Sequence, residues 1–301
     1  KQIYLKMFEK THKVDIMPTM SQIQNYIRNR RSRIGDNNNL DELGKYVETK
    51  RYKHLSTREN QLFVFGDELG DGSDENHFHL GFTSHKLLRR MYEHNAQENG
   101  VFHLDSTYKI VKYNYPLFVL GYTDLNRHFH PVVFMYSSHE QIGDFEHFFR
   151  SFKNLCLDFD LEFSPKYIVT DAWKASAAAI ASELPNTLHL MCYFNVKYNI
   201  RKCRNDSLPV SMYQEVMKDV TDLHNTLSIG EFEMLSADVL KRWRKKPDML
   251  AFADYFENTW LNSAFNRWQL FWTEPGKAHR NSYNKEIKSS FTKRIKHHIK
   301  R

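Results

Sequence analysis

The stretch Val101-Phe-His-Leu-Asp-Ser-Thr-Tyr-Lys-Ile-Val111 decides the fold of this chain. Apolar and β-branched residues dominate it, and Gly100 marks a break before it, so the pattern predicts a β-strand. One acid, Asp105, interrupts the strand. A carboxylate within an apolar strand is costly unless a metal ion, a basic partner or an exposed strand end compensates it. We therefore expect Asp105 to belong to a site to which later acids of the chain contribute.

The composition indicates a folded, basic protein. The chain has 301 residues, of which 41% are hydrophobic, and a formal net charge of +7 with a pI of about 9.1. This charge favours a polyanionic partner, nucleic acid first and an anionic membrane surface second, although a merely basic soluble protein has the same balance. Three cysteines are too few for a disulfide framework and favour a reducing compartment. No apolar run of about 18 residues is present, so no membrane span is expected, and the first residues show no signal-peptide pattern.

Strands and helices follow one another in a definite order over residues 98–206. Three strands with short polar links predict an antiparallel meander, at residues 101–111, 116–124 and 131–136. A helix, a strand ending at Asp171, an Ala-rich helix and a fifth strand follow, at residues 138–157, 166–170, 173–184 and 187–195. This order is that of a ribonuclease-H-like α/β fold, with a mixed five-stranded sheet and flanking helices.

That fold pairs the first strand with the fourth, so we expect Asp105 and Asp171 to be neighbours although 171 − 105 = 66 positions separate them. Two close carboxylates raise each other's pKa unless a cation lies between them. Mg²⁺ takes oxygen ligands, and two such ions roughly 3.5–4 Å apart can clamp both oxygens of a phosphodiester displacement. The alternative is that both aspartates merely cap strand ends or begin turns.

The sequence pattern of residues 1–97 predicts a small α+β region with a basic helix and a short hairpin. The basic helix suits a DNA-binding unit, or it is a solvated face packed on the main domain. Its arginines are Arg28, Arg30, Arg31 and Arg33. In the hairpin, His77 and His79 share one strand face. No cysteine or carboxylate stands at metal spacing beside them in the sequence, so a polar strand face is expected rather than a metal site.

The pattern in the last third of the chain predicts an all-helical insertion at residues 207–272. A final core helix with a basic tail is expected to follow it, at residues 273–301. The aromatic residues of the insertion recur at helical spacing, which favours core packing over base stacking. The tail is suited to phosphate contacts. The lysines and arginine expected to make them are Lys288, Lys293, Arg294 and Lys296.

Several motifs together resemble Mutator-like element (MULE) transposases. His103-Leu-Asp-Ser-Thr-Tyr-Lys109 is similar to the first-acid motif of that family, and Ile168-Val-Thr-Asp-Ala-Trp173 to the second. Between them, Phe129-His-Pro-Val-Val-Phe-Met135 and Ser137-Ser-His-Glu140 resemble the intervening strands. His189-Leu-Met-Cys-Tyr-Phe-Asn195 resembles the Cys-x-x-His element, with Asn195 in place of the family's His. The order and spacing of these motifs are more specific than any one of them.

The resemblance implies a nuclear DNA transposase that uses Mg²⁺ or Mn²⁺ at a two-metal site and three acids. It implies binding to double-stranded DNA, namely terminal inverted repeats and target DNA, as a homodimer and with no membrane partner. Asp105 and Asp171 would be the first two acids. For the third, Glu286 is one candidate, whereas alignment of Ser282-Tyr-Asn-Lys-Glu-Ile-Lys288 puts Asn281 at that position.

Two other functions remain open from the sequence. The first is a domesticated or catalytically disabled DNA-binding protein derived from a transposase, which an asparagine at the third position would favour. The second is a ribonuclease-H-like nuclease that acts on RNA. The basic helix near the start and the long helical insertion argue against a simple nuclease, because such an enzyme needs neither.

Overall fold

The computed structural model describes residues 40–52, 60–108, 111, 114–204 and 206–274. The chain divides into two compact units, Lys1–Thr49 and Lys50–Arg301. In the first unit, the described residues belong to helix α3 (Leu40–Lys50), which carries Asp41 and Glu42 in its first turn and ends at Lys50. This distribution of charge complements the helix dipole. The expected boundaries of the N-terminal region, core, insertion and tail stay predictions.

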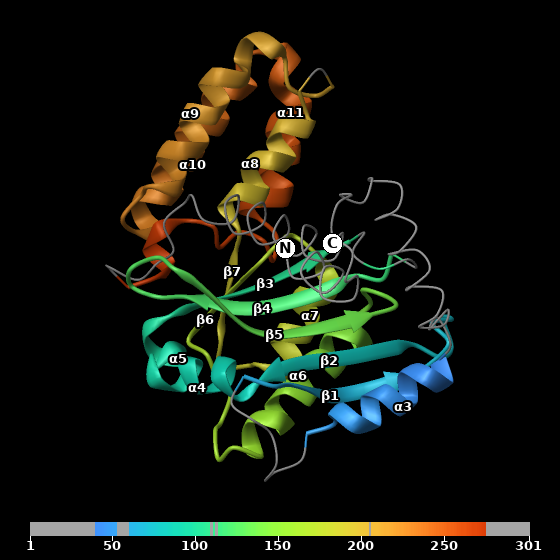
Figure 1. The fold of residues 1–301 in the computed structure, drawn as a ribbon. Coiled ribbons are helices and arrows are strands. Elements are labelled where there is room, and N and C mark those ends of the chain that lie inside the picture. Colours follow the sequence, from blue (N-terminus) through green and yellow to red (C-terminus); the bar gives the residue numbers. More distant parts are fainter. Residues whose placement is uncertain (1–39, 53–59, 109–110, 112–113, 205, 275–301) are drawn as a thin grey trace, which may run out of the picture. The chain divides into compact units, whose positions relative to one another are not determined.

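One sheet of seven strands is the centre of the second unit, in the order β1-β2-β5-β4-β3-β6-β7 (Figure 1). The first five strands in this order pair antiparallel, whereas β3–β6 and β6–β7 are parallel pairs. A mixed α/β fold is therefore confirmed. The strands are β1 (Leu62–Leu69), β2 (Phe78–Ser84), β3 (Val101–Thr107), β4 (Leu117–Thr123), β5 (Phe129–Ser137), β6 (Tyr167–Thr170) and β7 (Leu188–Met191).

The sheet has seven strands rather than the expected five, because the early hairpin joins it. Strand β2 pairs with β5, with Leu80 opposite Tyr136 and Phe82 opposite Phe134. The hairpin thereby satisfies backbone groups that would otherwise form an open edge of the meander. A sequence pattern shows that two strands form a hairpin, but it does not show which sheet edge the hairpin joins.

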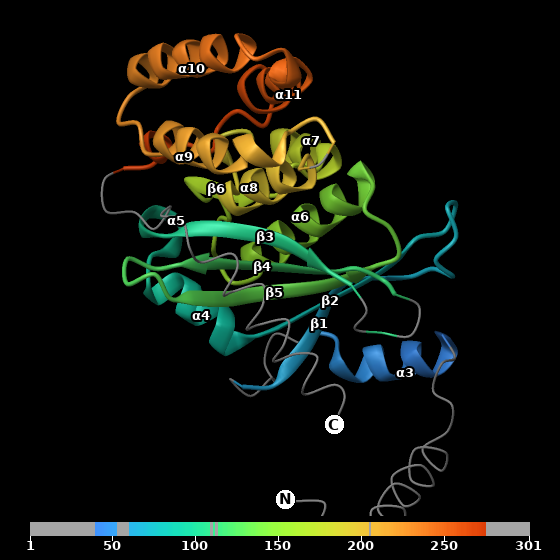
Figure 2. The same cartoon turned by 90° about the horizontal axis from the view of Figure 1, so that it is seen from above.

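Four helices pack with the sheet around the main hydrophobic core: α4 (His85–Glu93), α5 (Ala96–Asn99), α6 (Ile142–Leu157) and α7 (Lys174–Glu183). Both views place α6 and α7 side by side (Figures 1 and 2). The repeated phenylalanines of α6 enter the core, where Phe145 stacks on Phe118 of β4 with ring centroids 4.5 Å apart. Strand β4 is buried at every position, as expected for the middle of a covered sheet.

A bundle of helices follows β7 and lies at that end of the sheet (Figures 1 and 2). It consists of α8 (Tyr193–Lys202), η1 (Val210–Met212), α9 (Tyr213–His224), α10 (Ile229–Arg244), η2 (Pro247–Met249), α11 (Leu250–Phe256), the π-turn η3 (Glu257–Leu261) and η4 (Leu270–Trp272). Its core is aromatic: Trp260 and Trp268 are fully buried, and Trp268 Nε1 donates to the Trp260 carbonyl at 2.9 Å. Core packing of these aromatic residues is confirmed. The insertion is not helical throughout, because the run of α11 and η3 ends at Leu261 and the next helical turn, η4, begins at Leu270.

Several elements begin or end at other residues than expected. The residues from Thr83 to Asn95 also suit a helix in the sequence, but α4 begins at His85, because the Thr83 hydroxyl donates to the Val132 carbonyl at 2.6 Å instead of capping the helix. The fifth expected strand was too long: β7 ends at Met191, and α8 begins at Tyr193. Asn195 therefore lies in the first turn of a helix, where its backbone N–H donates to the Cys192 carbonyl at 2.9 Å.

Candidate active site

The register between β3 and β6 brings Asp105 and Asp171 to the same level of the sheet. Phe102 lies opposite Ile168 and His103 opposite Val169, each pair being 66 positions apart. The same offset relates Asp105, within β3, to Asp171, which follows the last residue of β6. Neighbouring strands lie about 4.8 Å apart, so the backbone positions that carry the two carboxylates are adjacent.

Asp171 also begins a turn, as the simpler alternative expected. Its carbonyl accepts a hydrogen bond from the Trp173 N–H at 2.9 Å and one from the Thr170 hydroxyl at 2.9 Å. Since that hydroxyl proton is used, Thr170 Oγ1 accepts from His189 Nε2 at 2.7 Å. Burial, followed by the positive charge of Arg267, lowers the pKa of His189 to about 4. A neutral His189 on β7 therefore orders the backbone next to Asp171.

A third carboxylate, Glu140, lies at the same edge of the sheet. The strands β3, β5 and β6 end there, because β5 runs in the direction of β3 after two antiparallel turns. The Tyr108 hydroxyl donates to the Glu140 carboxylate, and Trp173 Nε1 donates to the Glu140 carbonyl at 2.9 Å. Burial raises the pKa of Tyr108, and the hydrogen bond to Glu140 and the charges of Glu140 and Asp171 raise it further.

Glu140 is the functional candidate that the sequence reasoning missed. It stood inside the motif Ser137-Ser-His-Glu140 but was given no role. Its position directly after a strand could have revealed it, because the first, third and fourth strands of the expected sheet all end at one edge. Its hydrogen bonds with Tyr108 and Trp173 had no sequence signal, since these residues are about 30 positions away in either direction.

The other candidate residues lie outside the part of the chain that the structure describes. This holds for the basic helix near the start, for both candidates for the third acid and for the basic tail. They are Arg28, Arg30, Arg31, Arg33, Asn281, Glu286, Lys288, Lys293, Arg294 and Lys296.

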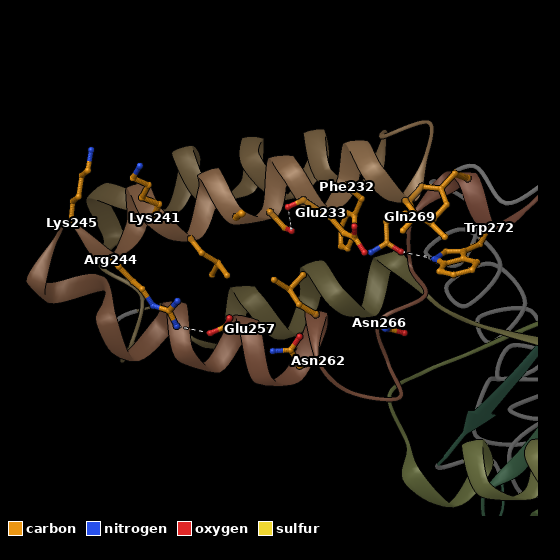
Figure 3. Close-up of a pocket in the computed structure, with 16 residues that line it drawn as sticks. Phe232, Glu233, Lys241, Arg244, Lys245, Glu257, Asn262, Asn266, Gln269 and Trp272 are labelled. Atoms are coloured by element: carbon orange, nitrogen blue, oxygen red, sulfur yellow. Dashed lines mark hydrogen bonds and ion pairs between the residues drawn. The ribbon is translucent and has the colours of Figure 1, made fainter.

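A pocket of about 870 Å³ lies in the helical insertion (Figure 3). Helix α10, η3 and the segment up to Trp272 line it. Arg244 on its rim is engaged by Asp254 at 2.8 Å and Glu257 at 2.5 Å, and these two acids raise the pKa of Arg244. Lys241 and Lys245 also line the pocket, and both are exposed. The insertion therefore presents two lysines to solvent along α10.

Carboxylates lie beside His77 and His79 in the structure, although none stands at metal spacing beside them in the sequence. Asp144 at the start of α6 contacts both imidazoles at 2.8 Å, and Glu68 contacts His79 at 3.1 Å. Asp144 is 67 positions from His77 in the sequence and reaches it only because α6 packs against β1 and β5. Spacing within a single strand could not reveal this neighbourhood.

These features define a mixed α/β domain with acidic side chains gathered where parallel strands end. Residues 101–199 match the family model of the MULE transposase domain, while a comparison with curated proteins found no match. The chain thus carries a MULE transposase domain, and the resemblance to Mutator-like transposases is confirmed. The matched domain suggests a transposase-related function, and the family of that domain implies DNA binding and general use of divalent metal ions.

No helix among the described residues is long and apolar enough to cross a bilayer.

Proposed function

We propose that this chain is a DNA transposase of Mutator-like type, which binds element ends, cleaves a DNA strand and transfers the resulting 3′-hydroxyl to target DNA. The observation that carries the proposal is the shared register position of Asp105 and Asp171 within the matched domain. The proposal includes action in the nucleus and assembly as a homodimer on DNA, since transposition joins two element ends.

The strand order supports a ribonuclease-H-like core. Within the sheet, β5-β4-β3-β6-β7 is the order that this fold requires, with the first core strand in the middle beside the fourth. The hairpin of β1 and β2 is then an addition at the outer edge of the meander. Such a core positions acids on separate strands while leaving their shared edge open to a nucleic acid.

The donor set at this edge fits a hard divalent cation. Asp105, Asp171 and Glu140 offer carboxylate oxygens, which Mg²⁺ and Mn²⁺ prefer. Bound there, such ions would neutralise phosphate charge and activate the attacking water or hydroxyl. Asp105 and Asp171 would hold them, with either Glu286 or Glu140 as the third acid. Tyr108 orients Glu140 through its hydroxyl, and Trp173 fixes the backbone that carries it.

The test combines strand cleavage and DNA binding on the same substrate. A labelled duplex with the terminal inverted repeat of the element is incubated with the full chain and Mn²⁺, and a gel-shift of that duplex is run beside it. We expect cleavage by the wild type, and loss of cleavage with retained binding for Asp105→Asn and Asp171→Asn. The exposed Asp248→Asn is the matched control. If either Asp variant cleaves at the wild-type rate, the proposed two-acid site is wrong.

Binding without cleavage by the wild type would favour the alternative of a domesticated or disabled transposase. The presence of Asn281 at the aligned third position is the observation behind that alternative. The variant Asn281→Glu distinguishes the two cases, because restored cleavage would show that only the third acid is missing.

A further inference from the structure

A cluster of two histidines and one glutamate lies at the hairpin end of the sheet. Glu68 of β1, His79 of β2 and His147 of α6 each offer one ligand atom, and these atoms lie within 4.8 Å of one another. The Glu68 carboxylate is 3.1 Å from His79 Nδ1 and 3.4 Å from His147 Nδ1. Adjacent ligands of a tetrahedral ion with bonds of about 2.0–2.1 Å are separated by similar distances.

Strand register and a β-bulge position the three side chains. Glu68 lies directly opposite His79 in the β1–β2 register, just after a bulge that follows Phe65. Gly66, inside the bulge, has a φ of +55°, and a Cβ there would lie 2.5 Å from Ser151 Cβ of α6. Glycine thus allows the bulge and the close approach of α6, and bulges commonly re-aim side chains beside functional sites.

Hydrogen bonding determines which nitrogen of each histidine carries the proton. His79 Nε2 is 2.8 Å from Oδ1 of the fully buried Asp144. The Asp144 carboxylate also accepts a hydrogen bond from the Gln141 N–H at 2.7 Å and lies 2.8 Å from His77 Nδ1. A carboxylate surrounded by donors accepts from each of them, so His79 donates through Nε2. His147 Nε2 is 2.9 Å from the Gly66 carbonyl, which also only accepts, so His147 likewise donates through Nε2.

This assignment leaves three acceptors facing one another. In the neutral imidazoles, the Nδ1 atoms of His79 and His147 carry lone pairs, and both face the Glu68 carboxylate. A proton on His79 alone would give Glu68 one donor but leave the His147 lone pair facing the carboxylate, and protons on both rings would stack two imidazolium ions with centroids 4.2 Å apart. A bound cation instead satisfies all three acceptors at once.

The adjacent group of His77, His79 and Asp144 differs in this respect. There, Asp144 receives hydrogen bonds from His77 Nδ1 and His79 Nε2, both at 2.8 Å, and from the Ser137 hydroxyl at 3.2 Å. Its donors and acceptors match without an ion. Asp144 is better described as the carboxylate that orients His79, in the way that outer carboxylates orient metal-binding histidines.

We propose that Glu68, His79 and His147 bind one transition-metal ion, for which Zn²⁺ is the best match. Two imidazoles and a carboxylate are ligands that Zn²⁺ accepts, and each imidazole has an outer partner, Asp144 or the Gly66 carbonyl. Coordination requires the two rings to tilt out of their 16° stack so that their lone pairs converge. Glu68, with 60% of its side chain exposed, leaves the remaining coordination position toward solvent.

Such an ion would fasten the added hairpin to helix α6. Two of its ligands come from the hairpin strands β1 and β2 and the third from α6, which is distant from them in sequence, so the metal would cross-link the outer edge of the sheet to that helix. The site shares no residue with Asp105, Asp171 or Glu140. It is therefore testable without DNA and without cleavage activity.

The experiment measures metal binding by the full chain after chelator treatment. Zn²⁺ alone is titrated against a chromophoric chelator, and Co²⁺ alone is used as a spectroscopic probe of a site with nitrogen ligands. Loss of an outer partner typically weakens metal binding by about 10–100-fold, so removal of a direct ligand should weaken it by at least about 100-fold. We expect this loss for Glu68→Gln and His147→Asn, together with loss of the Zn²⁺-dependent rise in Tm.

The matched controls are Glu75→Gln, which changes an exposed acid of the same hairpin, and Asp105→Asn with Asp171→Asn. All three should keep the tight Zn²⁺ site. Because Glu68 is largely exposed, Glu68→Gln should fold normally, which a circular dichroism spectrum checks. Unchanged Zn²⁺ affinity in folded Glu68→Gln, or an equal loss in Glu75→Gln, would overturn the proposal.

Discussion

Asp105 and Asp171 stand 66 positions apart in the chain, and the same offset separates each residue pair in register between β3 and β6. The two acids are therefore placed by backbone pairing, since Asp105 lies within β3 and Asp171 directly follows β6. A site built on paired strands is held more precisely than one built on loops, and metal-assisted phosphoryl transfer depends on such positioning.

Glu140 should contribute to cleavage if it belongs to this site. Glu140→Gln keeps the size of the side chain and removes its charge, so we expect cleavage to fall at least about tenfold while DNA binding is retained. Tyr108→Phe, which removes only the hydroxyl that donates to Glu140, should have a smaller effect in the same direction. Cleavage rates over a range of Mn²⁺ concentrations provide the measurement. If Glu140→Gln cleaves like the wild type at every concentration, Glu140 is not a metal ligand.

The lysines of α10 should contribute to DNA affinity. Lys241 and Lys245 are exposed one helical turn apart, whereas Arg244 between them is held by Asp254 and Glu257. Replacing both lysines by glutamine should weaken DNA binding and reduce the slope of log affinity against log salt by up to about 2. Gel-shift titrations at several salt concentrations measure this. Lys218→Gln on the neighbouring helix α9 is the control. An unchanged salt slope in the double variant would show that DNA does not contact these two lysines.

Stability should fall in mild acid because of His189. Its pKa is about 4 in the folded chain and 6.5 in the unfolded chain, so the unfolded state binds more protons between these values. The contribution is present in full above pH 6.5 and is lost as the pH falls toward 4. At pH 5.0 the loss is about 2 kcal/mol.

Urea unfolding at pH 7.5 and pH 5.0, in the presence of a chelator, tests this prediction. His189→Gln can still donate toward Thr170 but cannot titrate, so it should lose about 2 kcal/mol less than the wild type between the two pH values. His128→Gln, at an exposed turn, is the control. An equal loss in His189→Gln and the wild type would show that His189 is not buried as described.

Gly66 should be intolerant of a side chain for two separable reasons. Gly66→Ala places a residue with a Cβ at φ +55°, at a cost of about 1–2 kcal/mol, and brings that Cβ within 2.5 Å of Ser151 Cβ. We expect a total loss of more than 2 kcal/mol in the free energy of unfolding. Adding Ser151→Gly should recover the part caused by the close contact, beyond the cost of Ser151→Gly alone. If the double variant shows no such coupling in urea unfolding, the approach of α6 to the bulge is looser than described.

Much of the core could be predicted from the sequence because its signals are local. Alternating or continuous apolar runs predicted β3, β4 and β5, and the phenylalanine spacing of α6 predicted its buried face. The pairing of Asp105 with Asp171 followed from the element order, because a ribonuclease-H-like fold places its first strand beside its fourth. The contacts of Glu140 with Tyr108, and of Asp144 with His77, could not be predicted. They depend on how helices and turns pack after the sheet has formed.

The long separation of β3 and β6 has a consequence for the order of folding. The meander β3–β4–β5 closes through short connections, whereas the β3–β6 pair requires closure of a loop that contains the whole of α6. Closing the longer loop costs more chain entropy, and non-local pairing slows folding. We therefore expect amides of β4 to gain protection from hydrogen exchange before those of β6 during refolding. Asp105 and Asp171 would then come together only in the later steps of folding. A folding chain would therefore form most of its sheet before it forms the proposed active site.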